Sequence, residues 1–121
     1  MTSTTGTARH LPREIAGWEC DWQLRGSHLE LQMRRKDRRS ASIGQLLAGR
    51  LVIRRAHDGW HTETRFWIVE DLAEHQRLRV RRGSAPTLAE LRELLSEAGL
   101  PPDLVTTVVE STAALETSAA V

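Results

Sequence analysis

Two segments near the start of the chain alternate between apolar and polar residues. In residues 18–25 and again in residues 28–34 every second position is apolar, and a period of two predicts a half-buried strand. Residues 26–27, Gly-Ser, suit a two-residue hairpin turn between them. A hairpin closed there places Trp22 opposite Leu31 on an apolar face, which supports this register.

Residues 50–57 and 60–68 favour two further strands, which flank an Asp-Gly pair at 58–59. Asp-Gly is a strong signal for a two-residue hairpin turn. With these two residues as the turn, the expected cross-strand pairs are Leu51 with Phe66, Ile53 with Thr64, Arg54 with Glu63, and Arg50 with Trp67. Residues 42–45 precede this hairpin and are compatible either with a short helical turn or with the start of a long strand.

Strict alternation returns in the fifth segment, residues 77–81, Arg-Leu-Arg-Val-Arg. We expect a strand with Leu78 and Val80 facing inward. Arg77, Arg79 and Arg81 then point outward together. Apolar residues at helical spacing within 70–76 allow a short helix before this strand.

Residues 87–116 change to a helical pattern. Thr87 precedes Glu90 by three positions, which is a capping box, and leucines follow along one stripe. Gly99 and the prolines after it end this first helix. Residues 103–115 fit a second helix, although the β-branched run Val-Thr-Thr-Val-Val leaves a terminal strand as the rival interpretation.

These elements predict an α+β fold in a single domain, as expected for a chain of 121 residues. An antiparallel sheet of about five strands is built from two hairpins, and one of its faces is covered by the C-terminal helices. The expected domain spans 14–116, with the sheet in 17–82 and the helices in 87–116. We expect a flexible arm at 1–13 and a frayed tail at 117–121. The uncovered face of such a sheet is exposed to water and available for binding.

Composition adds a charge asymmetry to this picture. The net charge is +1, yet residues 1–86 carry 16 basic and 10 acidic side chains, whereas residues 87–121 carry one arginine and six acids. A basic body with an acidic end is compatible with an anionic partner. The alternative is an ordinary solvated surface, because an arginine-rich composition with a single lysine also arises from a GC-rich coding sequence.

The same composition also argues against several classes of protein. The single cysteine, Cys20, precludes an internal disulfide and is best explained as a core residue, together with Trp18, Trp22 and Trp60. No apolar run is long enough to span a membrane, and the first ten residues lack the apolar stretch of a signal peptide. The expected location is the cytoplasm, and no cofactor is predicted.

The strongest candidate surface is the arginine-bearing face of the sheet with the basic loop that follows the first hairpin. Guanidinium groups bind phosphate oxygens, and an exposed indole offers a stacking platform for a base. The candidate nucleic-acid-binding residues are Arg34, Arg50, Arg54, Arg65, Trp67, Arg77, Arg79 and Arg81 on strands, and Lys36, Arg38 and Arg39 in the loop. One outward aromatic residue is few for a single-strand binder, and the arginines have glutamates nearby.

Catalysis and metal binding have weaker support. His61, Glu63 and Arg65 share one strand face and offer an acid, a base and a cation for phosphodiester cleavage. Any polar strand face gives such trios, so they remain low-specificity candidates. The possible ligands His57, His61, Glu63 and His75 do not form a complete metal site, because His57 and His61 point to opposite faces of a hairpin.

The sequence thus predicts a small non-catalytic binding protein that docks an anionic partner, most plausibly nucleic acid, on an arginine-rich sheet face. The alternative is a protein–protein interaction module that binds an acidic protein surface. We also expect a homodimer, because four tryptophans exceed what two helices readily cover and because Val105 and Val109 lie off the main apolar stripe. A small RNA-cleaving enzyme that uses His61 and Glu63 is the third possibility.

Overall fold

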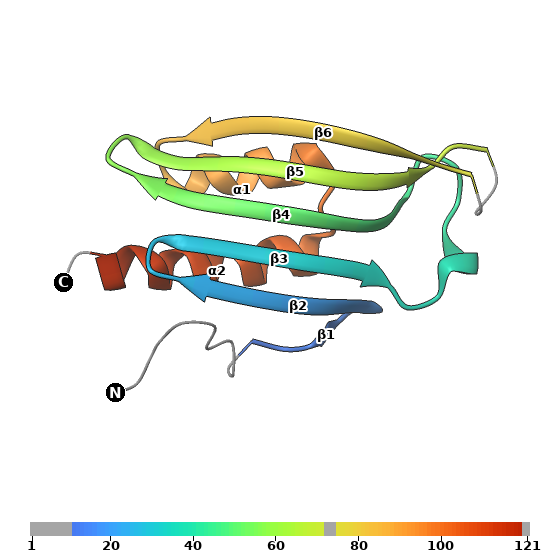
Figure 1. Ribbon diagram of the computed structural model, residues 1–121, viewed down its shortest axis with the longest axis horizontal. Helices are drawn as coiled ribbons and strands as arrows, with labels where there is room; N and C mark the ends of the chain where they lie inside the picture. The colour runs from blue at the N-terminus through green and yellow to red at the C-terminus, as the bar shows by residue number, and fades with distance from the viewer. Residues whose placement is uncertain (1–10, 72–74, 120–121) are drawn as a thin grey trace.

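The computed structural model describes residues 11–71 and 75–119. Its strands form one antiparallel sheet in which each strand pairs with its neighbours in chain order (Figure 1). The elements are β1 (Glu14–Ile15), β2 (Trp18–Arg25), β3 (His28–Arg35), a 3-10 turn η1 (Arg38–Ser40), β4 (Leu46–Ala56), β5 (Gly59–Val69), β6 (Gln76–Ala85), α1 (Leu88–Ala98) and α2 (Pro102–Ala119).

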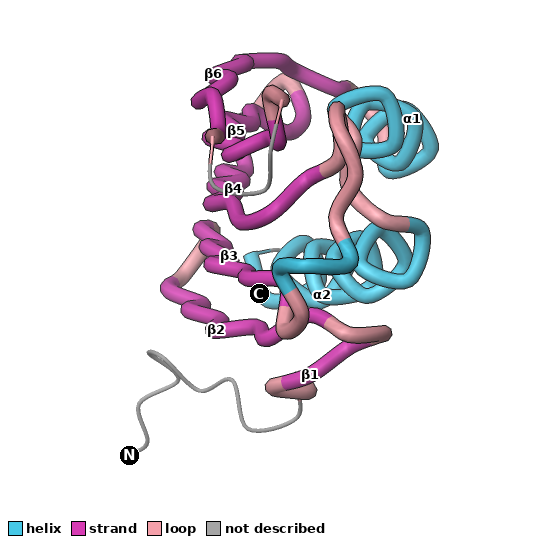
Figure 2. The backbone as a smooth tube through the Cα atoms, turned by 90° about the vertical axis from the view of Figure 1, so that its right-hand side faces the viewer, coloured by secondary structure: helices cyan, strands magenta, loops and turns pink. Residues whose placement is uncertain are grey.

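Both helices lie on the same side of the sheet, and the other side is open (Figure 2). This arrangement confirms the α+β class and the antiparallel sheet with C-terminal helices. The sheet has six strands where about five were expected, because β1 adds a two-residue strand along the edge of β2. No helix in the described ranges is both long and apolar enough to cross a membrane.

The first hairpin forms in the predicted register. Trp22 pairs with Leu31 and Leu24 pairs with Leu29 on the helix-covered face. Alternation of buried and exposed residues along β2 follows directly from the period of two in the sequence.

The core lies between the sheet and the helices. Trp18, Trp22 and Trp60 are all buried there, with Cys20 beside the first two. The burial of three tryptophans within one chain confirms their assignment to the core and leaves only Trp67 exposed, at 41%.

Two valines on α2 change the argument for a dimer. Val105 and Val109 were interpreted as a second apolar helix face, yet both are buried in the core of this chain. That support for a helix-mediated contact between copies is therefore removed. The homodimer remains a prediction.

The second hairpin forms with a register that differs by two residues from the expected one. Ala56 pairs with Gly59, so His57 and Asp58 form the turn. Gly59 belongs to β5 with φ +126°, and a Cβ there would lie 2.4 Å from the carbonyl oxygen of Ala85. Gly59 is thus needed for the close approach of β5 to the end of β6. A shift of two keeps every side chain on its predicted face but gives it a new partner.

β6 is where the sequence interpretation is wrong. Leu78 and Val80 face outward, at 39% and 46% exposure, and pair with Trp67 and Arg65 on the open face. The three arginines that alternate with them face the helix side instead. Gly83 and Ala85 determine which residues of β6 face the helices. α1 packs so closely over this strand that a Cβ on Gly83 would lie 2.7 Å from Leu94.

α1 begins and ends as its capping residues predict. The Thr87 hydroxyl accepts a hydrogen bond from the backbone N–H of Glu90, and Gly99 ends α1 in the left-handed conformation. α2 is a helix and not a strand. The hydroxyl of Thr112 donates to the carbonyl of Val108 one turn earlier, which satisfies a buried polar group inside the helix.

The connecting segments complete the chain. Residues 42–45 form a turn in which the Gln45 side chain accepts a hydrogen bond from the N–H of Ser42, and the long strand β4 follows.

The expected helix within 70–76 falls partly on residues outside the described ranges, and β6 already includes Gln76. The expected arm at 1–13 lies mostly outside them too, but Pro12 accepts a hydrogen bond from the Trp22 indole. At the other end α2 continues to Ala119.

Candidate nucleic-acid interface

The open face of the sheet is organised in rows that run across the strands. Each row joins residues that are directly paired between β2 and β6, and neighbouring rows are two residues apart along each strand. From the end nearest η1 to the hairpin end the rows are Glu19, Arg34, Ala48, Trp67 and Leu78; Asp21, Gln32, Arg50, Arg65 and Val80; Gln23, Glu30, Val52, Glu63 and Arg82; and Arg25, His28, Arg54, His61 and Ser84.

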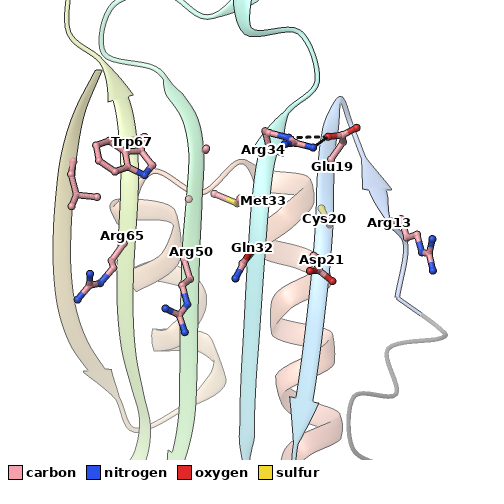
Figure 3. Close-up of a pocket in the computed structure, with 13 residues that line it drawn as sticks. Arg13, Glu19, Cys20, Asp21, Gln32, Met33, Arg34, Arg50, Arg65 and Trp67 are labelled. Carbon is pink, nitrogen blue, oxygen red and sulfur yellow. Dashed lines mark hydrogen bonds and ion pairs between the residues drawn. The ribbon is translucent and has the colours of Figure 1, made fainter. Parts of the chain in front are cut away.

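The first of these rows contains a hollow of about 720 Å³, here called the aromatic hollow. Its floor includes Ala48, whose methyl group is too short to fill the space between Arg34 and Trp67, its two neighbours in the row. Figure 3 shows Trp67 on one side of this floor and the ion pair of Arg34 with Glu19 on the other. Trp67 therefore presents part of its indole to an open space that is large enough for a planar ligand group.

A second hollow of about 610 Å³, here called the basic hollow, lies further along the same face. Val52 stands at its centre, with arginines before and after it on β4. Its lining residues are His28, Arg50, Val52, Arg54, His61, Thr62, Glu63, Arg65, Arg82 and Gly83.

Two arginines line both hollows. Arg50 and Arg65 are paired across β4 and β5, in the row between Trp67 and Val52. In Figure 3 both side chains extend away from Trp67. The two hollows are thus neighbouring parts of one surface.

Carboxylates hold several of the open-face arginines. Arg34 lies 2.7 Å from Glu19, a pair at the rim of the aromatic hollow. The exposed parts of such pairs are solvated, and surface ion pairs contribute only about 0–1 kcal/mol. A phosphate can therefore replace a carboxylate at modest cost.

Within the basic hollow the same pairing is incomplete. Arg50 lies 2.8 Å from Glu30, and its hydrogen bond lowers the pKa of that carboxyl group. Arg65 lies 2.9 Å from Glu63, and it likewise lowers the pKa of the Glu63 carboxyl group. Arg82 contacts the same Glu63 at the longer distance of 3.5 Å.

Arg54 is the exception among the cations of this hollow. It stands between His28 and His61 in the last row, and within the described ranges it makes no hydrogen bond or ion pair. The two-residue shift in register is the cause, because Arg54 faces His61 and no longer faces Glu63. The four arginines of the basic hollow therefore exceed the carboxylates of Glu30 and Glu63 by two positive charges.

The structure brings together five of the eleven nucleic-acid-binding candidates, namely Arg34, Arg50, Arg54, Arg65 and Trp67. Two basic residues of the basic hollow were not singled out from the sequence at all. His28 was on the expected open face but had no arginine neighbour in the sequence to draw attention to it. Arg82 lay one residue past the expected strand, and the incorrect phase of that strand hid its position.

Arg77, Arg79 and Arg81 lie on the other face of the sheet. Arg79 donates to the carbonyl of Ala98 and Arg81 donates to the carbonyl of Glu97, so both contact the C-terminal end of α1. A cation there interacts favourably with the helix dipole. Burial, followed by the charges of Arg81 and Arg77, lowers the pKa of Arg79.

The basic loop after β3 is also separate from the hollows. Lys36 pairs with Glu14 at 3.1 Å, and Arg38 and Arg39 belong to the 3-10 turn η1. None of the three lines either hollow.

His61, Glu63 and Arg65, the candidates for catalysis, all lie in the basic hollow. Glu63 is engaged by two arginines and its pKa is lowered, which makes it a weaker base. His61 contacts Asp58 at 3.0 Å. In the part of the chain that the structure describes, no three His, Cys, Asp or Glu side chains are grouped to hold a metal ion.

Comparison with protein-family models, with curated proteins and with solved structures finds no match.

Proposed function

We propose that this protein binds single-stranded nucleic acid on the open face of its sheet. The observation that carries the proposal is the adjacency of the aromatic and basic hollows, which share Arg50 and Arg65. One hollow offers guanidinium groups to phosphates and the other offers an indole face to a base. Aromatic platforms beside cationic grooves are the usual means of binding single strands.

The spacing of the rows fits this arrangement. Trp67 and Glu63 lie four residues apart on β5, which corresponds to about 13 Å along a strand. A phosphate above Val52 and a base against Trp67 can belong to the same short segment. A duplex fits less well, because its bases are already stacked on each other and cannot lie flat on Trp67.

An acidic protein surface is the second candidate partner. Leu78 and Val80 extend the exposed apolar area from Trp67 to the edge of the sheet. Protein interfaces combine aromatic, aliphatic and arginine side chains in this way. The carboxylates of such a partner would contact the same arginines.

Titration of the protein with fluorescently labelled, mixed-sequence single-stranded RNA, single-stranded DNA and duplex DNA tests the proposal. We expect the anisotropy to report tighter binding of single strands than of duplex, with an affinity that falls steeply as salt rises. Trp67→Ala should weaken binding by about 1–3 kcal/mol, whereas the matched variant Trp67→Phe should retain most of the affinity because it keeps a stacking surface.

Two results would overturn the proposal. Absence of binding by the wild-type protein at low salt would do so and would make the acidic protein surface the leading candidate. Equal loss of affinity in Trp67→Ala and Trp67→Phe, with both variants folded, would show that stacking on residue 67 is not used.

A further inference from the structure

We infer that the basic hollow binds the terminal phosphate of the strand, a phosphomonoester, in preference to an internal phosphodiester. This inference rests on the function proposed above and specifies which group of the nucleic acid enters the hollow.

The charge of the hollow matches a monoester. Four arginines line it, and the two carboxylates beside them leave two positive charges in excess. A phosphomonoester carries about −1.5 to −2 charges at neutral pH, whereas an internal phosphodiester carries a single negative charge. A doubly charged group is therefore the better electrostatic complement.

The geometry of the hollow also favours a chain end. Arg50 and Arg54 flank Val52 on β4, while Arg65 and Arg82 approach from β5 and β6. The four arginines thus lie on three adjacent strands, in the row of Val52 and in the rows on either side of it. A surface that follows a continuous backbone distributes its cations along the path of successive phosphates.

The available hydrogen-bond donors lie on the same residues. Arg54 has no partner in the described part of the chain, and Arg82 is held by the longest of the arginine–carboxylate contacts in the hollow, at 3.5 Å. Each guanidinium has five N–H donors in a planar fork. A terminal phosphate presents three unshared oxygens to these donors, one more than an internal phosphate presents.

The neighbouring surface then defines the path of the strand away from its phosphorylated end. From the basic hollow the shared arginines, Arg50 and Arg65, lead to Trp67. A strand anchored by its end above Val52 would place a nucleotide close to that end against the indole.

The test compares one single-stranded RNA sequence in three forms, with a 5′-phosphate, with a 3′-phosphate and with hydroxyl groups at both ends. We expect one phosphorylated form to bind about tenfold tighter or more than the hydroxyl form. Arg54→Gln should remove most of that preference. Arg77→Gln, which removes the same charge on the opposite face of the sheet, should preserve it.

The possible failures are distinguishable. Equal affinity of all three forms would overturn the inference and leave the proposed function standing, whereas failure of every form to bind would overturn both. Inorganic phosphate is the remaining probe. If it displaced the labelled strand at the same concentration as the phosphorylated strand does, the hollow would be a site for free phosphate and the inference would fail.

Discussion

At the scale of single residues, the open face is defined by which arginines have a carboxylate partner. Glu30 and Glu63 hold Arg50 and Arg65, while Arg54 has no partner among the described residues. The carboxylates thus limit the net positive charge of the basic hollow. Removal of a carboxylate should therefore strengthen the binding of phosphate there.

Glu30→Gln should raise the affinity for single-stranded RNA several-fold, because it removes a negative charge and frees Arg50 for phosphate. Glu14→Gln is the matched control, since Glu14 pairs with Lys36 away from both hollows. Fluorescence anisotropy measures the affinity of both variants for the labelled RNA. An unchanged or lower affinity in Glu30→Gln would contradict the assignment of the basic hollow to phosphate.

Cys20 provides a residue-scale prediction on the core. Burial raises the pKa of its thiol to about 11, so the thiol stays protonated at neutral pH and the nucleophilic thiolate is scarce. We expect a disulfide reagent such as DTNB to react slowly with the folded protein and fast in denaturant. Rapid labelling of the folded protein would contradict this assignment.

The raised pKa of Cys20 also makes the free energy of unfolding depend on pH. A thiol whose pKa is higher in the folded state than its ordinary value of 9.0 contributes stability below pH 9. That contribution is lost as pH rises from 9 to about 11. Urea denaturation of the wild type and of Cys20→Ala across this interval should show the steeper decline in the wild type.

At the scale of elements, periodicity determines the face of a residue but only partly its neighbour. Turn chemistry favoured Asp58-Gly59, whereas packing against Ala85 places Gly59 in β5 and moves the turn to His57-Asp58. The resulting shift of two residues puts Ala48 opposite Trp67, which opens the aromatic hollow. This pairing could not be derived from local sequence, because it depends on the end of β6.

β6 shows a second limit of the pattern. An edge strand has weak burial on both faces, so alternation of arginine with Leu78 and Val80 does not reveal which set faces the helices. The decisive contact is between Gly83 and Leu94 of α1. It connects elements that are distant in the sequence, whereas the first hairpin was predictable because its turn and its apolar pairs agree.

Gly59→Ala tests the register of β4 and β5. Its positive φ and the close carbonyl of Ala85 should together cost about 1–3 kcal/mol or more. Gly26→Ala also alters a glycine with positive φ, but a Cβ there meets nothing within 4 Å, so it should cost only about 1 kcal/mol. Urea denaturation measures the unfolding free energy of both variants. A smaller loss of unfolding free energy in Gly59→Ala than in Gly26→Ala would contradict the observed turn.

Arg79→Gln tests the phase of β6. Loss of the hydrogen bond to Ala98 at the C-terminal end of α1 should cost roughly 1–2 kcal/mol of unfolding free energy. Arg77→Gln should stay within about 0.5 kcal/mol of the wild type, because no hydrogen bond to α1 is lost. If the two arginines were instead equivalent and outward, both substitutions would leave the unfolding free energy unchanged.

At the scale of the whole molecule, the two layers differ in charge. The segment that forms the helices carries most of the acidic excess, and the segment that forms the sheet carries the basic excess. Because the helices cover only one face (Figure 2), the acidic layer lies behind the sheet. A polyanion is therefore attracted toward the open face, where the two hollows lie.

The most direct test of this account compares two charge-matched double variants for binding of a phosphorylated single-stranded RNA. Arg54→Gln with Arg82→Gln removes two charges from the open face, and Arg77→Gln with Arg81→Gln removes two from the helix-facing side. We predict that the first pair lowers affinity about tenfold or more, while the second pair changes it far less. Equal losses, or a larger loss in the second pair, would contradict the assignment of binding to the open face.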